Sequence, residues 1–137
     1  MFNQSTRYID VLARALMAAI FILSGLGKIS AFAATQGYME AFGVPGILLI
    51  PTIAFELGAG FALLVGFQTR LVALALAGFS VISALVFHAN FGDQMQQINF
   101  LKNLAMAGGF LILAKNGAPG FSIDQLLASR HRANSAA

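Results

Sequence analysis

A few ionisable side chains lie within otherwise apolar stretches of this sequence, and Glu56 is the most unusual of them. It is the only charged residue between positions 41 and 69, near the middle of residues 45–67. A carboxylate at the centre of a membrane-spanning helix costs about 2.5–3.5 kcal/mol, so it usually faces a bundle interior and finds a partner. We therefore expect Glu56 to be a ligand-binding or proton-carrying group in a polar pocket. A structural ion pair that fixes the helix register is the alternative.

The candidate partners of Glu56 are basic residues of the other apolar stretches. A helix rises about 1.5 Å per residue, which places Lys102 nearest to the depth of Glu56 and makes it the predicted partner. Arg14 either reaches toward Glu56 or extends to the membrane surface. Lys28 and His88 are expected at the outer ends of their spans, as an interfacial anchor and a hydrated or proton-donating side chain. These five residues form the predicted pocket.

The elements that position these residues are membrane-spanning helices. Only 9% of the residues are charged and 58% are hydrophobic, whereas soluble domains carry about 25% charged residues. The length allows one membrane domain over residues 1–137, an all-α bundle with spans at about 8–29, 45–67, 71–88 and 94–115. A short interfacial helix is predicted between the first two spans. A cleaved signal peptide ending near residues 31–33 is the alternative for the first span.

Three local features refine these boundaries. Pro51 either kinks the second span or marks its start. Residues 125–137 form a polar, basic tail that we expect to be disordered, and Asp124, together with Ser122, is expected to cap a short segment before it. Arg14, Ala18, Phe21, Gly25 and Lys28 recur at spacings of three and four and predict one face of the first span.

Small residues indicate where helices approach each other closely. On the second span these are Ala54, Gly58 and Ala62, and on the third they are Ala77, Ser80 and Ala84. The orientation follows from the distribution of Lys and Arg. Six of these residues lie on the side of the termini and two on the other side, which predicts cytoplasmic termini.

Several kinds of chemistry are excluded by composition. The chain has no cysteine, which removes thiol redox relays and thiolate metal sites. Its two histidines, His88 and His131, are too few for a bis-histidine haem within the bundle, because the second lies in the polar tail. No metal cluster, nucleophile–base pair or basic nucleic-acid patch is found in the sequence. We predict no catalytic residue, no metal and no covalently bound cofactor, and a quinone is the candidate ligand.

The chain resembles the DoxX family of small bacterial membrane proteins over about residues 8–127. The resemblance lies in the order and spacing of several motifs: Arg14 with residues 24–28 (SGLGK), residues 43–45 (GVP), Glu56 with residues 66–70 (GFQTR), His88, Lys102 with residues 108–109, and residues 117–124 (GAPGFSID). It implies a four-span inner-membrane protein. Some family members are linked to oxidoreductase systems, such as thiosulfate–quinone chemistry or superoxide-defence complexes.

Three functions are compatible with these observations. The first is a membrane subunit of an oxidoreductase system that binds a quinone or a similar amphiphile near Glu56, Lys102 and His88. The second is a small-solute or proton permease that works as a homo-oligomer. The third is a non-catalytic membrane scaffold. The expected partners are the lipid bilayer and, for the first function, oxidoreductase subunits.

Overall fold

The structure is a computed structural model that describes residues 3–135, and every regular element in that range is a helix. The elements are α1 (Gln4–Ser30), α2 (Phe32–Ala41), the 3-10 turn η1 (Gly46–Leu48), α3 (Leu49–Val65), α4 (Thr69–Phe87), α5 (Gln94–Asn116) and α6 (Ile123–Ser135). Four segments are long and apolar enough to cross a membrane: α1, η1 with α3, α4, and α5. The predicted all-α fold with four spans and a short helix after the first one is confirmed.

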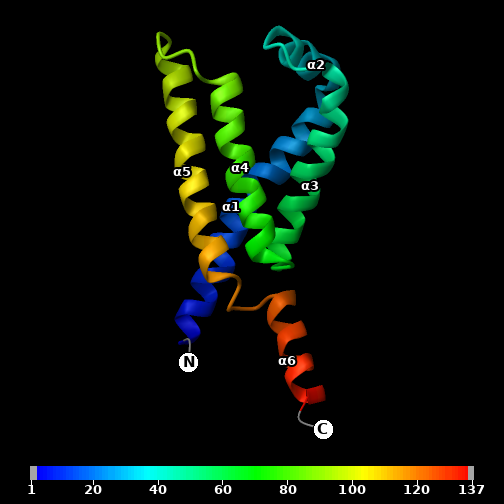
Figure 1. The fold of residues 1–137 in the computed structure, drawn as a ribbon, viewed down its shortest axis with the longest axis vertical. Coiled ribbons are helices and arrows are strands. Elements are labelled where there is room, and N and C mark those ends of the chain that lie inside the picture. Colours follow the sequence, from blue (N-terminus) through cyan, green and yellow to red (C-terminus); the bar gives the residue numbers. More distant parts are fainter. Residues whose placement is uncertain (1–2, 136–137) are drawn as a thin grey trace.

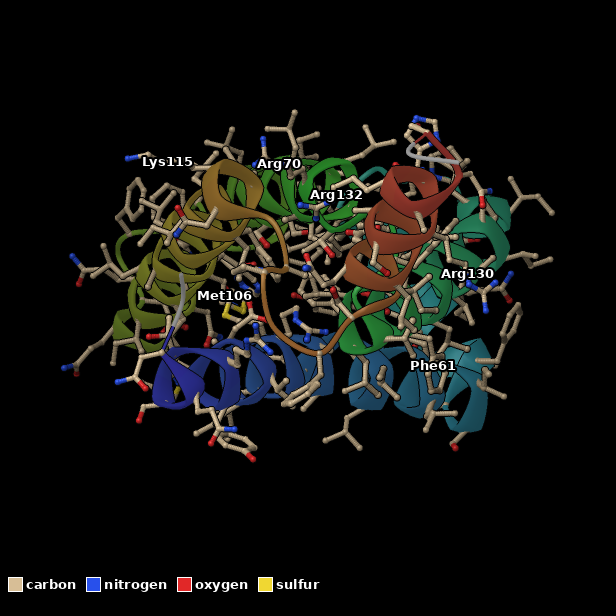
Figure 2. All side chains as sticks on the ribbon, turned by 90° about the horizontal axis from the view of Figure 1, so that it is seen from below. Phe61, Arg70, Met106, Lys115, Arg130 and Arg132 are labelled. Carbon is tan, nitrogen blue, oxygen red and sulfur yellow. The ribbon has the colours of Figure 1, made fainter. Side chains whose placement is uncertain are left out.

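The four spans associate as two pairs. α1 packs along α3, and α4 packs along α5, while contacts between the pairs are sparse. The pairs diverge toward the end at which α2 lies (Figure 1), and the first residues of α1 and the whole of α6 lie at the opposite end. Seen from that opposite end, Arg70 and Lys115 lie on the bundle and Arg130 and Arg132 on α6 (Figure 2).

The α1–α3 pair forms because each helix presents one row of buried residues. The buried row of α1 is Arg14, Ala18, Phe21 and Gly25, as predicted from its spacing. The buried row of α3 is Leu49, Ile53, Glu56, Gly60 and Leu63. A Cβ atom on Gly25 would lie 2.8 Å from Leu57, and one on Gly60 would lie 2.8 Å from Ile22, so these glycines permit the close approach. Ala54 and Gly58 were predicted for this role and are exposed instead.

Aromatic rings join the two pairs near the middle of the bundle. Phe21 of α1 lies 5.5 Å from Phe110 of α5 and 5.9 Å from Phe79 of α4, measured between ring centroids, and both contacts are edge-on. Ala77, Ser80 and Ala84 are buried on α4, as the small-residue pattern predicted. Beyond Phe21 the pairs diverge, and a second, smaller apolar cluster forms around Met39, Leu49 and Ile53.

The structure decides between the two interpretations of Pro51 and corrects the prediction for the C-terminal tail. α3 begins at Leu49, so Pro51 lies in its first turn, where the missing N–H has no helical partner to lose. Pro51 thus marks the start of the helix. The tail predicted to be disordered forms α6 as far as Ser135. No residue of α6 is buried. Because the helix has no apolar buried face, its sequence resembles that of a disordered, solvated tail.

Candidate functional site

Glu56 is paired with Lys28, which corrects the prediction that Lys102 is its partner. The Lys28 Nζ atom lies 3.0 Å from Glu56 Oε1 and donates a second hydrogen bond of 2.6 Å to Ser24 Oγ. Ser24 and Lys28 lie one helical turn apart on α1, opposite Glu56 on α3. Lys102 is exposed on α5 and takes no part in this cluster. The prediction was wrong because α3 packs against α1 and not against α5.

The Glu56 carboxylate has two unequal oxygens. Oε1 accepts the hydrogen bond from Lys28 and lies 3.5 Å from Ser24 Oγ. Oε2 is buried and has no hydrogen-bond partner among the described residues. The residue is 3% exposed, so its charge is balanced by Lys28 and not by solvent. The Lys28 side chain is 24% exposed, which makes it the member of the pair that a ligand can reach.

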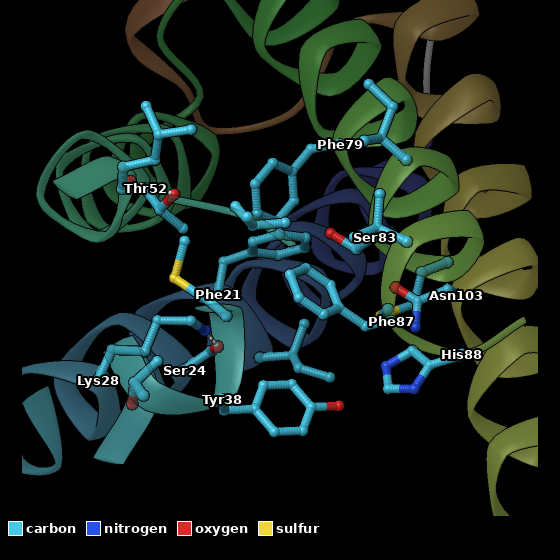
Figure 3. Close-up of a pocket in the computed structure, with 18 residues that line it drawn as sticks. Phe21, Ser24, Lys28, Tyr38, Thr52, Phe79, Ser83, Phe87, His88 and Asn103 are labelled. Carbon is cyan, nitrogen blue, oxygen red and sulfur yellow. Dashed lines mark hydrogen bonds between the residues drawn. The ribbon is translucent and has the colours of Figure 1, made fainter. Parts of the chain in front are cut away.

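A cavity of about 420 Å³ lies between the two helix pairs and has Lys28 and Ser24 in its wall. Figure 3 shows these two residues with Tyr38 on one side, and His88 with Asn103 on the other. The rings of Phe21, Phe79 and Phe87 also line the cavity. Tyr38 of α2 stacks on Phe87 of α4, with ring centroids 5.7 Å apart, so α2 contacts the other helix pair at the divergent end. The cavity thus has mostly apolar walls with polar groups on two opposite sides.

Lys28 and His88 each retain hydrogen-bonding capacity toward this cavity. An ammonium has three N–H donors, and Lys28 uses two of them on Ser24 and Glu56. The His88 ring contacts Gln96 Oε1 through Nδ1 at 2.6 Å, which orients the ring and leaves Nε2 without a hydrogen-bond partner among residues 3–135. The cavity can therefore bind a ligand that carries polar atoms at both ends of a flat apolar body.

Arg14 belongs to a separate cluster near the other end of the bundle. Its guanidinium donates to Asp10 Oδ2, to the carbonyls of Leu63 and Leu64 at the end of α3, and to the carbonyl of Phe121. Leu63 lies seven residues beyond Glu56, about 11 Å along the helix. Arg14 is fully buried and neither reaches Glu56 nor extends to the surface. Its role is to hold the segment before α6 against α1 and α3.

Asp124 also has a different role from the one predicted. Its carboxylate accepts hydrogen bonds of 2.8 Å from the backbone N–H groups of Gln68 and Thr69, and so caps the start of α4. The side chain of Ser122 accepts a hydrogen bond from the Gln125 N–H at the start of α6. Ser122 therefore caps α6 alone, and Asp124 connects the C-terminal segment to the turn between α3 and α4.

The five predicted pocket residues thus fall into three places. Glu56, Lys28 and His88 lie in or directly behind the cavity wall. Arg14 lies in the separate cluster near the other end of the bundle, and Lys102 lies on the outside of α5. Sequence reasoning missed Ser24 and Tyr38 as lining residues. The i, i+4 spacing of Ser24 and Lys28 on the predicted face was a signal that could have placed Ser24 beside Lys28.

These features define an integral helical protein with four membrane spans. The DoxX family model matches residues 9–89, which include Lys28, Glu56 and His88. The chain therefore belongs to the DoxX family, and it is a multi-pass protein of the inner membrane. No solved structure matches the chain.

Two Escherichia coli (strain K12) proteins are similar over most of their length. Inner membrane protein YqjF is 50% identical over 117 residues, which cover 85% of this chain and 90% of that protein. Inner membrane protein YphA is 34% identical over 131 residues, which cover 90% of this chain and 94% of that protein.

Proposed function

We propose that this protein is a membrane subunit of an oxidoreductase system and binds a quinone or a similar small amphiphile in the cavity between its helix pairs. The observation that carries the proposal is the position of Lys28. Its ammonium lies in the wall of a largely apolar cavity and is charge-balanced from behind by Glu56. A cation held in this way can donate to a ligand oxygen without carrying a net charge into the membrane.

The shape and lining of the cavity support a flat, ring-bearing ligand. About 420 Å³ lies within the usual range of roughly 300–1,000 Å³ for small-molecule pockets. Phe21, Phe79, Phe87 and Tyr38 provide faces and edges on which a ring can pack. A quinone has two carbonyl oxygens on opposite sides of its ring. The free N–H of Lys28 would donate to one of them, and His88 or Asn103 would bind the other.

Under this proposal the chain supplies the binding site and exchanges protons with it. Converting a quinone into a quinol takes two electrons and two protons. The electrons would come from a partner subunit, because the chain has no cysteine and no second histidine in its spans. Ser24 and Lys28 connect the cavity to the Glu56 carboxylate through hydrogen bonds, which gives a short route for a proton.

The orientation of the bundle completes the proposal. We place both termini in the cytoplasm, because Arg70, Lys115, Arg130 and Arg132 all lie at the end of the molecule where the termini lie (Figure 2). The cavity and α2 would then lie toward the opposite side of the membrane.

Binding can be tested with the purified full-length chain in lipid nanodiscs. The protein has no tryptophan and two tyrosines, Tyr8 and Tyr38. In the Tyr8→Phe variant all tyrosine fluorescence therefore comes from Tyr38 in the cavity wall. Titration with decylubiquinone is expected to quench this emission saturably, and Lys28→Met is expected to weaken binding at least about tenfold, as for a lost charged hydrogen bond.

Lys102→Met is the matched control, because Lys102 is exposed outside the cavity and its loss should leave the titration unchanged. Non-saturable quenching that is equal in all variants would refute quinone binding. Solute or proton flux into liposomes that depends on Glu56 would instead support the permease. Lys28→Met and Glu56→Gln variants that lose stability, but whose folded fraction titrates like the parent protein, would support the scaffold.

A further inference from the structure

α5 carries a charged side chain on a face that no other helix in the described part of the chain covers. Lys102 is the ninth residue of this span, about 12 Å from its start, and it is exposed. Within residues 3–135 no hydrogen bond or salt bridge reaches its ammonium. A Lys at the centre of a spanning helix costs about 2.5–3.5 kcal/mol when it faces lipid, so such residues usually pair.

The surface around Lys102 is shaped for another helix. We define the α5 outer face by its exposed residues at helical spacing: Ile98, Leu101, Lys102, Ala105, Gly108 and Ile112. A Cβ atom built on Gly108 meets nothing within 4 Å. Ala105 and Gly108 leave a shallow strip beside Lys102, which permits close approach of a second helix. α5 lies at the edge of the bundle and packs mainly against α4 (Figure 1), so this face is uncovered in the monomer.

The carboxylates of the chain itself are already engaged or lie outside the spans. Asp10 binds Arg14 and Glu56 binds Lys28. Asp93 caps α5 and Asp124 caps α4. The fifth acidic residue, Glu40, lies on α2, outside the four candidate spans. A second copy of this chain therefore offers no free carboxylate at the depth of Lys102.

We infer that the α5 outer face binds a membrane-spanning helix of a different protein, and that this helix carries an Asp or Glu that pairs with Lys102. The inference rests on the exposed charge within a span and on the engagement of the chain's own acids. It is independent of what occupies the cavity, because Lys102 does not line it.

The test is photo-crosslinking in the native membrane with the full-length chain. The probe is p-benzoylphenylalanine at position 101, on the outer face, and the control is the same probe at position 16, on the exposed side of α1. We expect position 101, and not position 16, to give an adduct with one other protein, joined at a span that contains an Asp or Glu.

Charge variants show whether Lys102 holds that partner. The adduct is expected to be lost in Lys102→Leu and retained in Lys102→Arg. It is also expected to be lost in Gly108→Leu, which fills the strip without touching the charge. Lys102→Glu should lose the adduct and regain it when the partner's carboxylate is replaced by Lys. Decylubiquinone binding should be unchanged in all these variants, which separates this test from that of the cavity.

Four results would overturn the inference. These are an adduct with another copy of this chain only, an adduct with lipid only, no adduct at all, and an adduct that Lys102→Leu does not reduce.

Discussion

Lys28 and Glu56 join α1 to α3 through an ion pair of 3.0 Å in which the two residues are unequally buried. The side chain of Glu56 is 4% exposed and that of Lys28 is 24% exposed. The acid therefore depends on the base for charge balance far more than the base depends on the acid. This asymmetry leads to the first prediction.

Removing Lys28 is expected to destabilise the protein more than removing Glu56. Lys28→Leu leaves an unpaired buried carboxylate, and breaking a buried pair from one side costs about 3–5 kcal/mol. Glu56→Leu leaves an ammonium that can reach solvent or headgroups and should cost less. The double variant should lose much less stability than the sum of the two. Reversible unfolding in sodium dodecyl sulfate measures all three, and additive losses would show that the pair is not coupled.

Arg14→Lys is expected to release the segment before α6, although it keeps the charge. The two terminal nitrogens of the guanidinium donate to the Leu64 and Phe121 carbonyls at the same time. The single nitrogen of a lysine ammonium cannot reach both carbonyls. Each lost hydrogen bond to a charged group is worth about 1.5–3 kcal/mol. Hydrogen exchange at residues 117–124 should become faster, while exchange in α4 and α5 should stay slow. Arg132→Lys, on the exposed part of α6, is the control and should change neither.

Gly66→Ala is expected to be strongly destabilising, in contrast to Gly58→Ala. Gly66 has φ 69°, and a Cβ atom there would lie 2.8 Å from Arg14 Nη1 and would also overlap Ser122. Gly58 lies within α3 with nothing inside 4 Å of its Cβ position, so alanine should stabilise the helix by up to about 1 kcal/mol. Thermal denaturation in detergent compares the two variants. Equal midpoints would contradict the close packing of the α3–α4 turn on Arg14.

The proposed orientation predicts which loops face the cytoplasm. Because the chain has no cysteine, single introduced thiols can be labelled without background. In spheroplasts, Asn90→Cys in the α4–α5 loop should react with a membrane-impermeant maleimide, and Ser129→Cys on α6 should react only after permeabilisation. The reverse pattern would invert the proposed orientation.

The sequence predicted the helices and their buried faces well, because a period of 3.6 residues is a local property. The face of α1 that contains Arg14, Ala18, Phe21 and Gly25 was recognised in this way. The pairing of helices was not, since the choice between Lys28 and Lys102 depended on which span packs against α3. The estimated depth of each residue in the membrane favoured Lys102, whereas the structure places Lys28 opposite Glu56.

Long-range contacts of the C-terminal segment were also beyond local reasoning. Asp124 caps a helix that begins 55 positions earlier in the chain, and Arg14 bonds a carbonyl 107 positions away. Neither partner leaves a periodic signal. The packing glycine of α3 could not be predicted from the sequence either. Gly58 and Gly60 are both glycines of the same span, but only Gly60 faces α1.

The divergence of the two helix pairs has a consequence for the route by which a ligand would enter the cavity. A cavity bounded by separate pairs has seams that face the hydrocarbon as well as an end that faces water. A hydrophobic ligand dissolved in the bilayer could enter laterally between the helix pairs and reach Lys28 without passing through water. Occupancy would then be set by the mole fraction of the ligand in the bilayer, and adding inert lipid at a constant total amount of ligand should lower it.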